Sequence, residues 1–177
     1  MLHAEARDFD RQLRLQAATD RAWRDASDGY MRMEKISYRS SAGDLDVPAF
    51  VFRPLGDGAP SSRPAIVWVH EDIRGHLYEH YIPYIREAVA RGYVVIAPEY
   101  RGSIGYGRDY YDAIDYGGNE VDDVVTAYDV LLGCAGKTKL VAPATIVSEA
   151  APFLSLRPIS AIPPSQSFAE KQLASVK

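Results

Sequence analysis

Two short, continuously apolar segments constrain the fold of this chain more than any other feature. Residues Ala65–Val69 and residues 93–97 contain only apolar or aromatic side chains, so we expect both faces of each strand to be buried. Strands of this kind belong to parallel sheets that helices cover on both sides. Residues 81–91 between them repeat apolar side chains at helical spacing, and Gly92 ends the repeat. The pattern predicts a β-α-β unit and hence an α/β fold.

The segments before this unit predict a helix followed by a hairpin. Residues 4–26 favour the helix, and charged residues separate its apolar positions. Its thin apolar stripe consists of Phe9, Leu13 and Ala17. Residues 33–39 and 47–53 flank a Ser-Ala-Gly-Asp turn, which predicts two antiparallel strands.

The segments after the unit predict a second helix and an edge strand. Residues 119–132 favour a helix whose apolar face consists of Val121, Val124, Val125, Tyr128 and Leu132. Its acidic residues are expected to stay in solvent, namely Glu120, Asp122, Asp123 and Asp129. Residues 141–147 favour a strand, and Pro143 in its middle places that strand at an edge of the sheet.

The composition of the chain changes near Gly133. Residues 1–133 are rich in acidic side chains and contain every histidine and every aspartate. Residues 134–177 carry an excess of basic side chains and are rich in alanine, proline and serine. We therefore predict a helical extension at 1–32, a partial α/β domain at 33–133 and a poorly ordered tail at 134–177.

Composition also excludes several classes of function. The single cysteine, Cys134, rules out a disulfide framework and a cysteine-based zinc site, and we expect no metal or cofactor. The net charge is −4 and no basic block is present, so nucleic acid is not an expected partner. No apolar run reaches the roughly 18 residues of a membrane span, and no signal peptide is visible. The sequence as given favours a cytoplasmic location.

Three local motifs are too incomplete to indicate a site. Residues 136–138 read Gly-Lys-Thr, but the chain has leucine where a phosphate-binding loop needs its first glycine. The glycines at 102, 105 and 107 do not have the spacing of a dinucleotide fingerprint. His76 and His80 have helical metal-ligand spacing, but a solvated helix start is the better interpretation.

Three longer stretches together carry a specific resemblance. They are Val-Trp-Val-His-Glu-Asp-Ile-Arg-Gly from Val67, Arg-Gly-Tyr-Val-Val-Ile-Ala-Pro-Glu-Tyr-Arg-Gly-Ser-Ile-Gly-Tyr-Gly from Arg91, and Gly-Gly-Asn-Glu-Val-Asp-Asp from Gly117. Residues 33–132 thereby resemble the front half of the catalytic domain in the prolyl oligopeptidase family of serine peptidases. The resemblance implies a truncated α/β-hydrolase fold of three layers (α/β/α), with a mostly parallel sheet preceded by an antiparallel hairpin. It also implies peptide or small ester substrates and an acyl-enzyme mechanism.

The residues that follow the two apolar strands are the candidate site. Sites in α/β sheets form at the carboxyl ends of parallel strands, where His70, Glu99 and Tyr100 are expected as pocket residues. In the α/β-hydrolase fold a backbone N–H after the first central strand stabilises the oxyanion, which makes Glu71 and Asp72 the candidate donors. The family usually has His-Gly-Gly here, whereas His-Glu resembles dienelactone hydrolases and leaves an ester substrate open. The resemblance also implies that Arg101 braces the tyrosine- and glycine-rich loop at 100–111 through its planar donors.

The triad that the resemblance requires is not found in the sequence. No G-x-S-x-G motif occurs, and the nearest mimic, Ser148, lacks both glycines. No aspartate followed by a histidine comes after a candidate serine, so none of the catalytic residues is retained. We therefore expect an inactive fragment whose tail, from about Cys134, does not continue the family and could arise from a shifted reading frame or a truncated gene model. A non-catalytic binding module, and a product that does not fold completely, are the alternatives.

Overall fold

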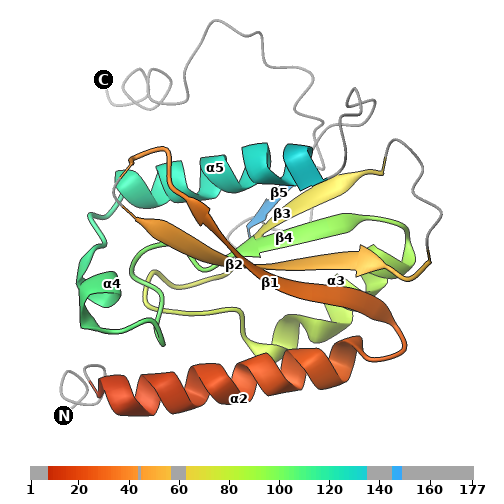
Figure 1. The fold of residues 1–177 in the computed structure, drawn as a ribbon, viewed down its shortest axis with the longest axis horizontal. Coiled ribbons are helices and arrows are strands. Elements are labelled where there is room, and N and C mark those ends of the chain that lie inside the picture. The colour runs from red at the N-terminus through yellow and green to blue at the C-terminus, as the bar shows by residue number, and fades with distance from the viewer. Residues whose placement is uncertain (1–7, 44, 57–62, 135–144, 149–177) are drawn as a thin grey trace, which may run out of the picture.

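A computed structural model describes residues 8–43, 45–56, 63–134 and 145–148 (Figure 1). The helices are α2 (Phe9–Ser27), the 3-10 turn η1 (Glu79–Tyr81), α3 (Ile82–Ala90), α4 (Arg108–Asp112) and α5 (Asn119–Cys134). The strands are β1 (Met31–Arg39), β2 (Asp46–Pro54), β3 (Ala65–Val69), β4 (Val94–Pro98) and β5 (Thr145–Ser148). Every described strand overlaps a segment where the sequence predicts one, whereas the short α4 and the 3-10 turn η1 were not predicted.

The five strands form one mixed sheet in the order β1-β2-β4-β3-β5. β1 and β2 form the predicted antiparallel hairpin, and β2 also pairs antiparallel with β4. β3 runs parallel to β4, with Val67 opposite Ile96, so the β-α-β unit is confirmed. The α/β fold class is confirmed too. The described sheet is mixed rather than mostly parallel, because β2 of the hairpin pairs antiparallel with both β1 and β4.

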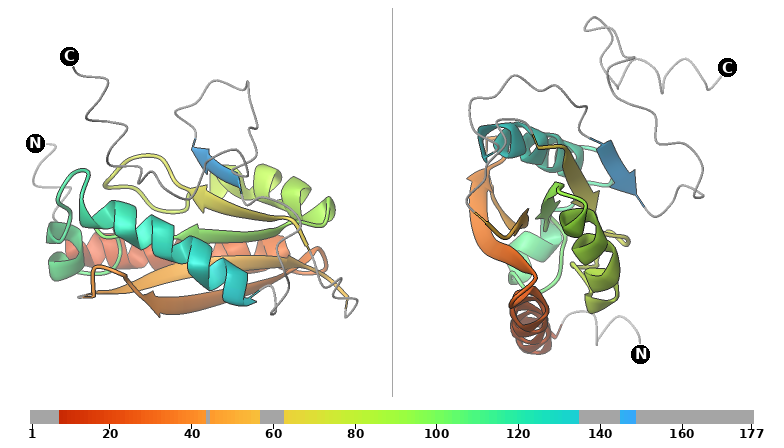
Figure 2. Two further views of the ribbon diagram at one scale, coloured as in Figure 1. Left: turned by 90° about the horizontal axis from the view of Figure 1, so that it is seen from above. Right: turned by 90° about the vertical axis from the view of Figure 1, so that its right-hand side faces the viewer.

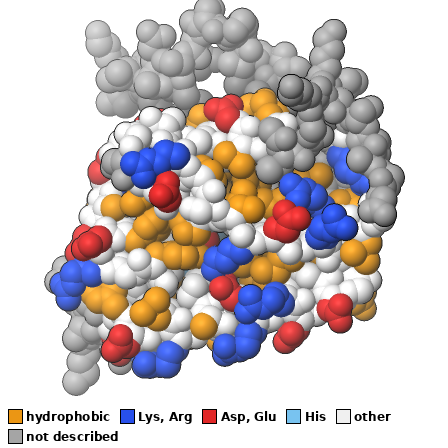
Figure 3. Space-filling view, viewed as in Figure 1, with side chains coloured by type: hydrophobic (Ala, Val, Ile, Leu, Met, Phe, Trp, Pro, Cys, Tyr) orange, Lys and Arg blue, Asp and Glu red, His pale blue; other side chains and the backbone are white. Residues whose placement is uncertain are grey.

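Helices cover both faces of this sheet, which gives the three layers expected of the fold (Figure 2). α5 packs on one face, against a core that includes Val47, Val67 and Ile96. α2 and α3 lie on the other side. On the face seen in Figure 3, acidic and basic side chains are interspersed among hydrophobic ones. Within the described residues, no helix combines the length and the apolar character that crossing a bilayer requires.

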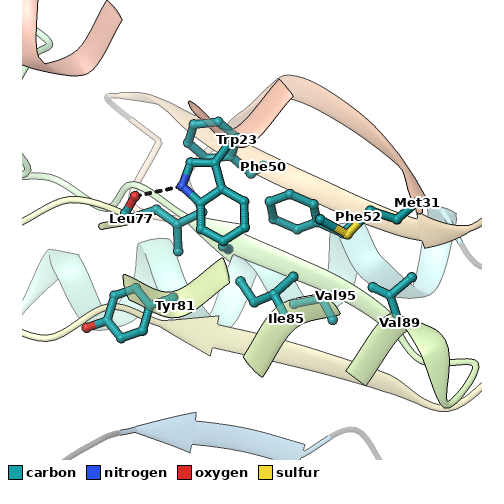
Figure 4. Close-up of a cluster of buried hydrophobic side chains, with 10 residues drawn as sticks. Trp23, Met31, Phe50, Phe52, Leu77, Tyr81, Ile85, Val89 and Val95 are labelled. Carbon is teal, nitrogen blue, oxygen red and sulfur yellow. Dashed lines mark hydrogen bonds between the residues drawn. The ribbon is translucent and has the colours of Figure 1, made fainter. Parts of the chain in front are cut away.

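Trp23 is the centre of the core beneath α2 and α3 (Figure 4). Its side chain is fully buried, and its ring centroid lies 4.9 Å from that of Phe52. The indole N–H donates to the carbonyl of Leu77 at 2.9 Å, which satisfies its one polar atom. α3 contributes Ile85 and Val89 to the same cluster. α2 and the loop that follows β3 are therefore fixed to the sheet through Trp23.

The buried face of α2 is not the predicted apolar stripe. Leu13 is 50% exposed and Ala17 is exposed, while Gln12, Gln16 and Thr19 are buried together with Trp23. The reason is that the N-terminal half of α2 packs on polar loops instead of an apolar sheet face. Gln12 accepts a hydrogen bond from the backbone N–H of Gly105, 3.3 Å away.

The buried face of α5 also differs from the prediction. Asp123 was expected in solvent but is fully buried, whereas Val121 and Val125 are 45% and 49% exposed. The helix is rotated so that Asp123, Ala127 and Leu131 point inward at four-residue spacing. A buried aspartate needs a partner, and Arg101 provides it.

The end of the chain is described only in part. β5 occupies an edge of the sheet, as predicted, and pairs in parallel with β3 so that Ser148 lies opposite Val69. Pro143, the Gly-Lys-Thr motif at 136–138 and the rest of the predicted poorly ordered tail lie outside the described residues. The predicted boundary at Gly133 falls one residue before the end of α5.

Candidate active site

The loops that follow β3 and β4 meet at the carboxyl edge of the sheet. His70 comes directly after β3, and Glu99 comes directly after β4. Because these two strands are parallel neighbours, both residues leave the sheet at the same end. The structure thus brings together all five residues that the sequence placed at this edge.

His70 connects the two loops. Its ring is buried, with Nε2 3.0 Å from the hydroxyl of Ser103 and Nδ1 3.0 Å from the carbonyl of Glu71. The ring stacks on Tyr100 with a centroid separation of 4.4 Å. Burial lowers the pKa of His70 to about 4, so the ring is neutral at neutral pH. Because both ring nitrogens contact protein groups, His70 acts here as a brace between the loops.

Glu71 and Asp72 form the exposed turn after this brace. The backbone N–H of Glu71 donates to the hydroxyl of Tyr81 at 3.1 Å, and its carboxylate lies 3.3 Å from Nε2 of His80. Asp72 has a φ of +63°, in the left-handed region. Its side chain accepts a hydrogen bond from the N–H of Arg74. The N–H of Asp72 makes no hydrogen bond within the described part of the chain.

Two further contacts hold this turn in place. The hydroxyl of Tyr100 donates to the carbonyl oxygens of His70 and Asp72, at 3.3 and 3.2 Å. Burial and the nearby carboxylates raise the pKa of Tyr100, which keeps the hydroxyl protonated as a donor. Gly75 closes the turn, and a Cβ at this position would lie 2.5 Å from the carbonyl oxygen of Glu71. The backbone path through 71–75 therefore requires a glycine.

Glu99 joins the end of β4 to the loop that follows β3. Its side chain is fully buried, and Oε1 accepts a hydrogen bond from the N–H of Leu77 at 2.7 Å. The other oxygen, Oε2, has no hydrogen-bond partner among the described residues. Burial raises the pKa of Glu99 to about 8, so the carboxyl group is mostly protonated at neutral pH. A neutral carboxyl group is the form that a site with one empty hydrogen-bonding position tolerates best.

The ion pair that holds the loop after β4 was not predicted from the sequence. Arg101 and Asp123 are 1% and 0% exposed, and Nε of the arginine lies 2.9 Å from Oδ2 of the aspartate. The guanidinium also donates to Oδ1, and the backbone N–H of Arg101 donates to Oδ2. The bracing role expected of Arg101 is thus confirmed. Asp123, Ala127 and Leu131 follow one another at four-residue spacing. This spacing was the available signal in the sequence that Asp123 lies on the buried face of α5.

The histidines at 76 and 80 lie beside this edge. The predicted solvated helix start is wrong for His76, which precedes η1 and is buried with its ring centroid 4.2 Å from that of Tyr78, and burial lowers its pKa. His80 faces the carboxylate of Glu71. Among the residues that the structure describes, no group of three or more metal-ligating side chains is found. At this edge the buried side chains of His70 and Arg101 hold the loops, whereas Oε2 of Glu99 and Nδ1 of His76 have no hydrogen-bond partner among the described residues.

Known proteins are similar to parts of this chain in sequence and in fold. The prolyl oligopeptidase family matches residues 80–140. A Bacillus subtilis relative named “Uncharacterized peptidase YuxL” is 34% identical over 101 residues, which is 54% of this chain and 15% of the relative. A puromycin-hydrolyzing peptidase of Mycobacterium tuberculosis superposes with a TM-score of 0.54 at 26% identity, over 66% of this chain and 18% of that one. The esterase Est22 has the same fold at 15% identity and a TM-score of 0.54, over 75% of this chain and 39% of that one.

The chain therefore spans about 15% of the length of the curated relative it matches. The matched residues include the strand β4, the glycine-rich loop after it and the helix α5 that holds this loop. The resemblance read from the motifs is confirmed: this part of the chain is related to the prolyl oligopeptidase family of serine peptidases and has the α/β-hydrolase fold.

Proposed function

We propose that this chain is part of a serine hydrolase that cleaves peptide or small ester bonds through an acyl-enzyme. In this proposal residues 33–133 supply the side of the active site that receives the substrate carbonyl. The observation that carries it is the turn at Glu71 and Asp72, which is exposed at the carboxyl edge while His70, Tyr100 and Gly75 hold it from behind. The relationship to serine peptidases supports the same assignment.

The backbone N–H groups of this turn would stabilise the oxyanion. Attack on a carbonyl places negative charge on its oxygen, and preorganised donors lower the barrier by typically ~3–4 kcal/mol for each donor. Asp72 offers an N–H without a protein acceptor in the described residues. The N–H of Glu71 already donates to Tyr81, so a substrate oxygen would share or replace that hydroxyl. The two donors are therefore not equivalent, and Asp72 is the better candidate.

We further propose that the 177-residue chain does not itself carry the nucleophile. The sequence has no G-x-S-x-G motif, and no acid and histidine follow Ser148. β5 brings the backbone of Ser148 to the carboxyl edge of the sheet, opposite Val69. A serine without a neighbouring base is a weak nucleophile, so this placement alone does not create a catalytic residue.

The coding DNA tests the serine-hydrolase assignment. The composition break near Gly133 leads us to expect that one of the two other reading frames after codon 133 encodes G-x-S-x-G, followed by an acid and a histidine. A protein expressed from that frame should react with a fluorophosphonate probe. If neither frame encodes the motif, this proposal fails.

A further inference from the structure

A shallow concavity of about 290 Å³ lies beside the proposed carbonyl-binding turn. α2 forms one wall, with Arg11, Gln12 and Leu15, and the loops and α4 form the other. The second wall consists of Asp72, Arg74, Ile104 and Tyr111. Asp72 belongs both to this wall and to the turn, so a molecule bound in the concavity would lie directly next to the proposed site. Figure 1 shows α4 beside the N-terminal end of α2, on this side of the molecule.

One guanidinium in the concavity is held in a fixed position. The Arg74 guanidinium lies 3.7 Å above the ring of Tyr111 and donates a hydrogen bond to the carbonyl of the same residue. Stacking on an aromatic ring leaves the edge of a guanidinium open, and its planar donors match a carboxylate. Because Arg74 is already ordered, binding an anion there would cost little additional side-chain entropy.

The charges and apolar groups of the concavity favour an anion with an apolar substituent. Arg11 contributes a second guanidinium, which forms no ion pair within the described residues, so two cations face the single carboxylate of Asp72. Leu15 is 44% exposed, and Ile104 and the Tyr111 ring also line the surface. A simple inorganic anion has no apolar part that could pack against these groups.

We infer that this concavity binds the C-terminal carboxylate of a short peptide, together with the apolar side chain of its last residue. The inference rests on the proposed function, since it places the leaving-group end of a peptide substrate next to the carbonyl-binding turn. It names the substrate class as short peptides with a free C-terminus. Binding itself requires no nucleophile, so it can be measured on the 177-residue chain.

The test is an NMR titration of the 15N-labelled full chain. The probes are N-acetyl-phenylalanine, its C-terminal amide, acetate and inorganic phosphate. We expect saturable shifts at the amides of Arg11, Leu15, Asp72 and Arg74 with N-acetyl-phenylalanine. The amide and acetate should bind at least tenfold more weakly, because each lacks either the charge or the ring. Equal binding of the acid and its amide would overturn the inference, and so would tighter binding of phosphate or no shifts at these positions.

Three variants locate the binding site. Arg74→Gln should weaken binding of N-acetyl-phenylalanine at least tenfold, and Arg11→Gln should weaken it severalfold. The matched control is Arg86→Gln, because Arg86 stacks on Tyr30 at 3.4 Å in a similar way but lines a different concavity. If Arg74→Gln does not fold, the exposed Arg11→Gln decides the result. Unchanged affinity in Arg11→Gln and Arg74→Gln, or an equal loss in Arg86→Gln, would refute the assignment. Failure here leaves the proposed function standing, since the DNA test does not depend on this concavity.

Discussion

The buried carboxyl group of Glu99 should make the stability of the folded protein depend on pH. Its folded-state pKa of about 8 lies above the ordinary value of 4.5, so the folded protein retains a proton that the unfolded chain releases in between. The free energy of unfolding should therefore fall as the pH rises from about 4.5 to about 8, by at most ~1.4 kcal/mol per pH unit. Urea denaturation at pH 6.8 and 7.8 should show this loss, and Glu99→Gln should remove it. The exposed Glu87→Gln is the control.

His70 should produce the opposite dependence at lower pH. Its folded-state pKa of about 4 lies below 6.5, so between these values the unfolded chain binds a proton that the folded protein does not. Stability should rise with pH from about 4 to about 6.5, and the lowered pKa of His76 acts in the same direction. In the wild-type protein Glu99 offsets this rise. A clear increase between pH 5 and 6.5 should thus appear in Glu99→Gln, and a flat profile in that variant would contradict the buried state of His70.

At the level of single residues, sequence reasoning succeeded where position in a strand decides the environment. Glu99 and Tyr100 follow an apolar strand of a parallel pair, so their place at the carboxyl edge could be predicted. Asp123 could not be placed in the same way, because its burial depends on Arg101, which lies 22 positions earlier in the chain. An acidic residue on a helix is usually solvated, and only the tertiary partner reverses this.

At the scale of secondary-structure elements, alanine substitutions at two glycines can test the contact of α2 with the glycine-rich loop after β4. Gly105 and Gly107 both have a φ near +90°, so alanine is strained at either position. Only at Gly105 would the added Cβ meet a neighbour, 2.5 Å from Cβ of Gln16. We expect Gly105→Ala to destabilise the protein by about 1–3 kcal/mol more than Gly107→Ala. Hydrogen exchange should show faster exchange across α2 in Gly105→Ala, and equal exchange in the two variants would contradict this packing.

The buried ion pair between the loop after β4 and α5 allows a similar comparison. Asp123→Ala removes the carboxylate that pairs with the buried Arg101 guanidinium, and such losses typically cost about 3–5 kcal/mol. The neighbouring Asp122 is exposed, so Asp122→Ala should change stability by no more than about 0.5 kcal/mol. Thermal or urea denaturation of both variants measures the difference. Similar values for the two would show that the Arg101–Asp123 pair does not hold the loop.

The elements themselves could be located from the sequence more reliably than their buried faces. Strands β3 and β4 are apolar on both sides, so no choice of face was needed. For α2 the apolar stripe gave the wrong face, because the surface beneath its N-terminal half is a polar loop that the periodicity of the helix does not reveal. Trp23 is the one fully buried apolar side chain of this helix, and of the predicted stripe Phe9 packs partly buried against Tyr111, so the buried face carries little periodic apolar signal.

At the scale of the whole molecule, the described residues form the part of an α/β-hydrolase sheet that surrounds the first parallel strand pair. The predicted hairpin, β-α-β unit and edge strand assemble into one sheet with helices on both faces. The loops at one end of this sheet are fixed to each other by His70 and Glu99, and Arg101 fixes the loop after β4 to α5. This construction supports the proposed carbonyl-binding turn and, in our account, leaves the nucleophile to a segment that this sequence does not encode.

The most direct test of this account is labelling of the purified 177-residue protein with a fluorophosphonate probe, measured by intact mass. The wild-type protein and Ser148→Ala should both remain unlabelled, while an active serine hydrolase treated in parallel gains one adduct. A single adduct on the wild-type protein that disappears in Ser148→Ala would contradict the account, because it would show that this chain carries a working nucleophile of its own.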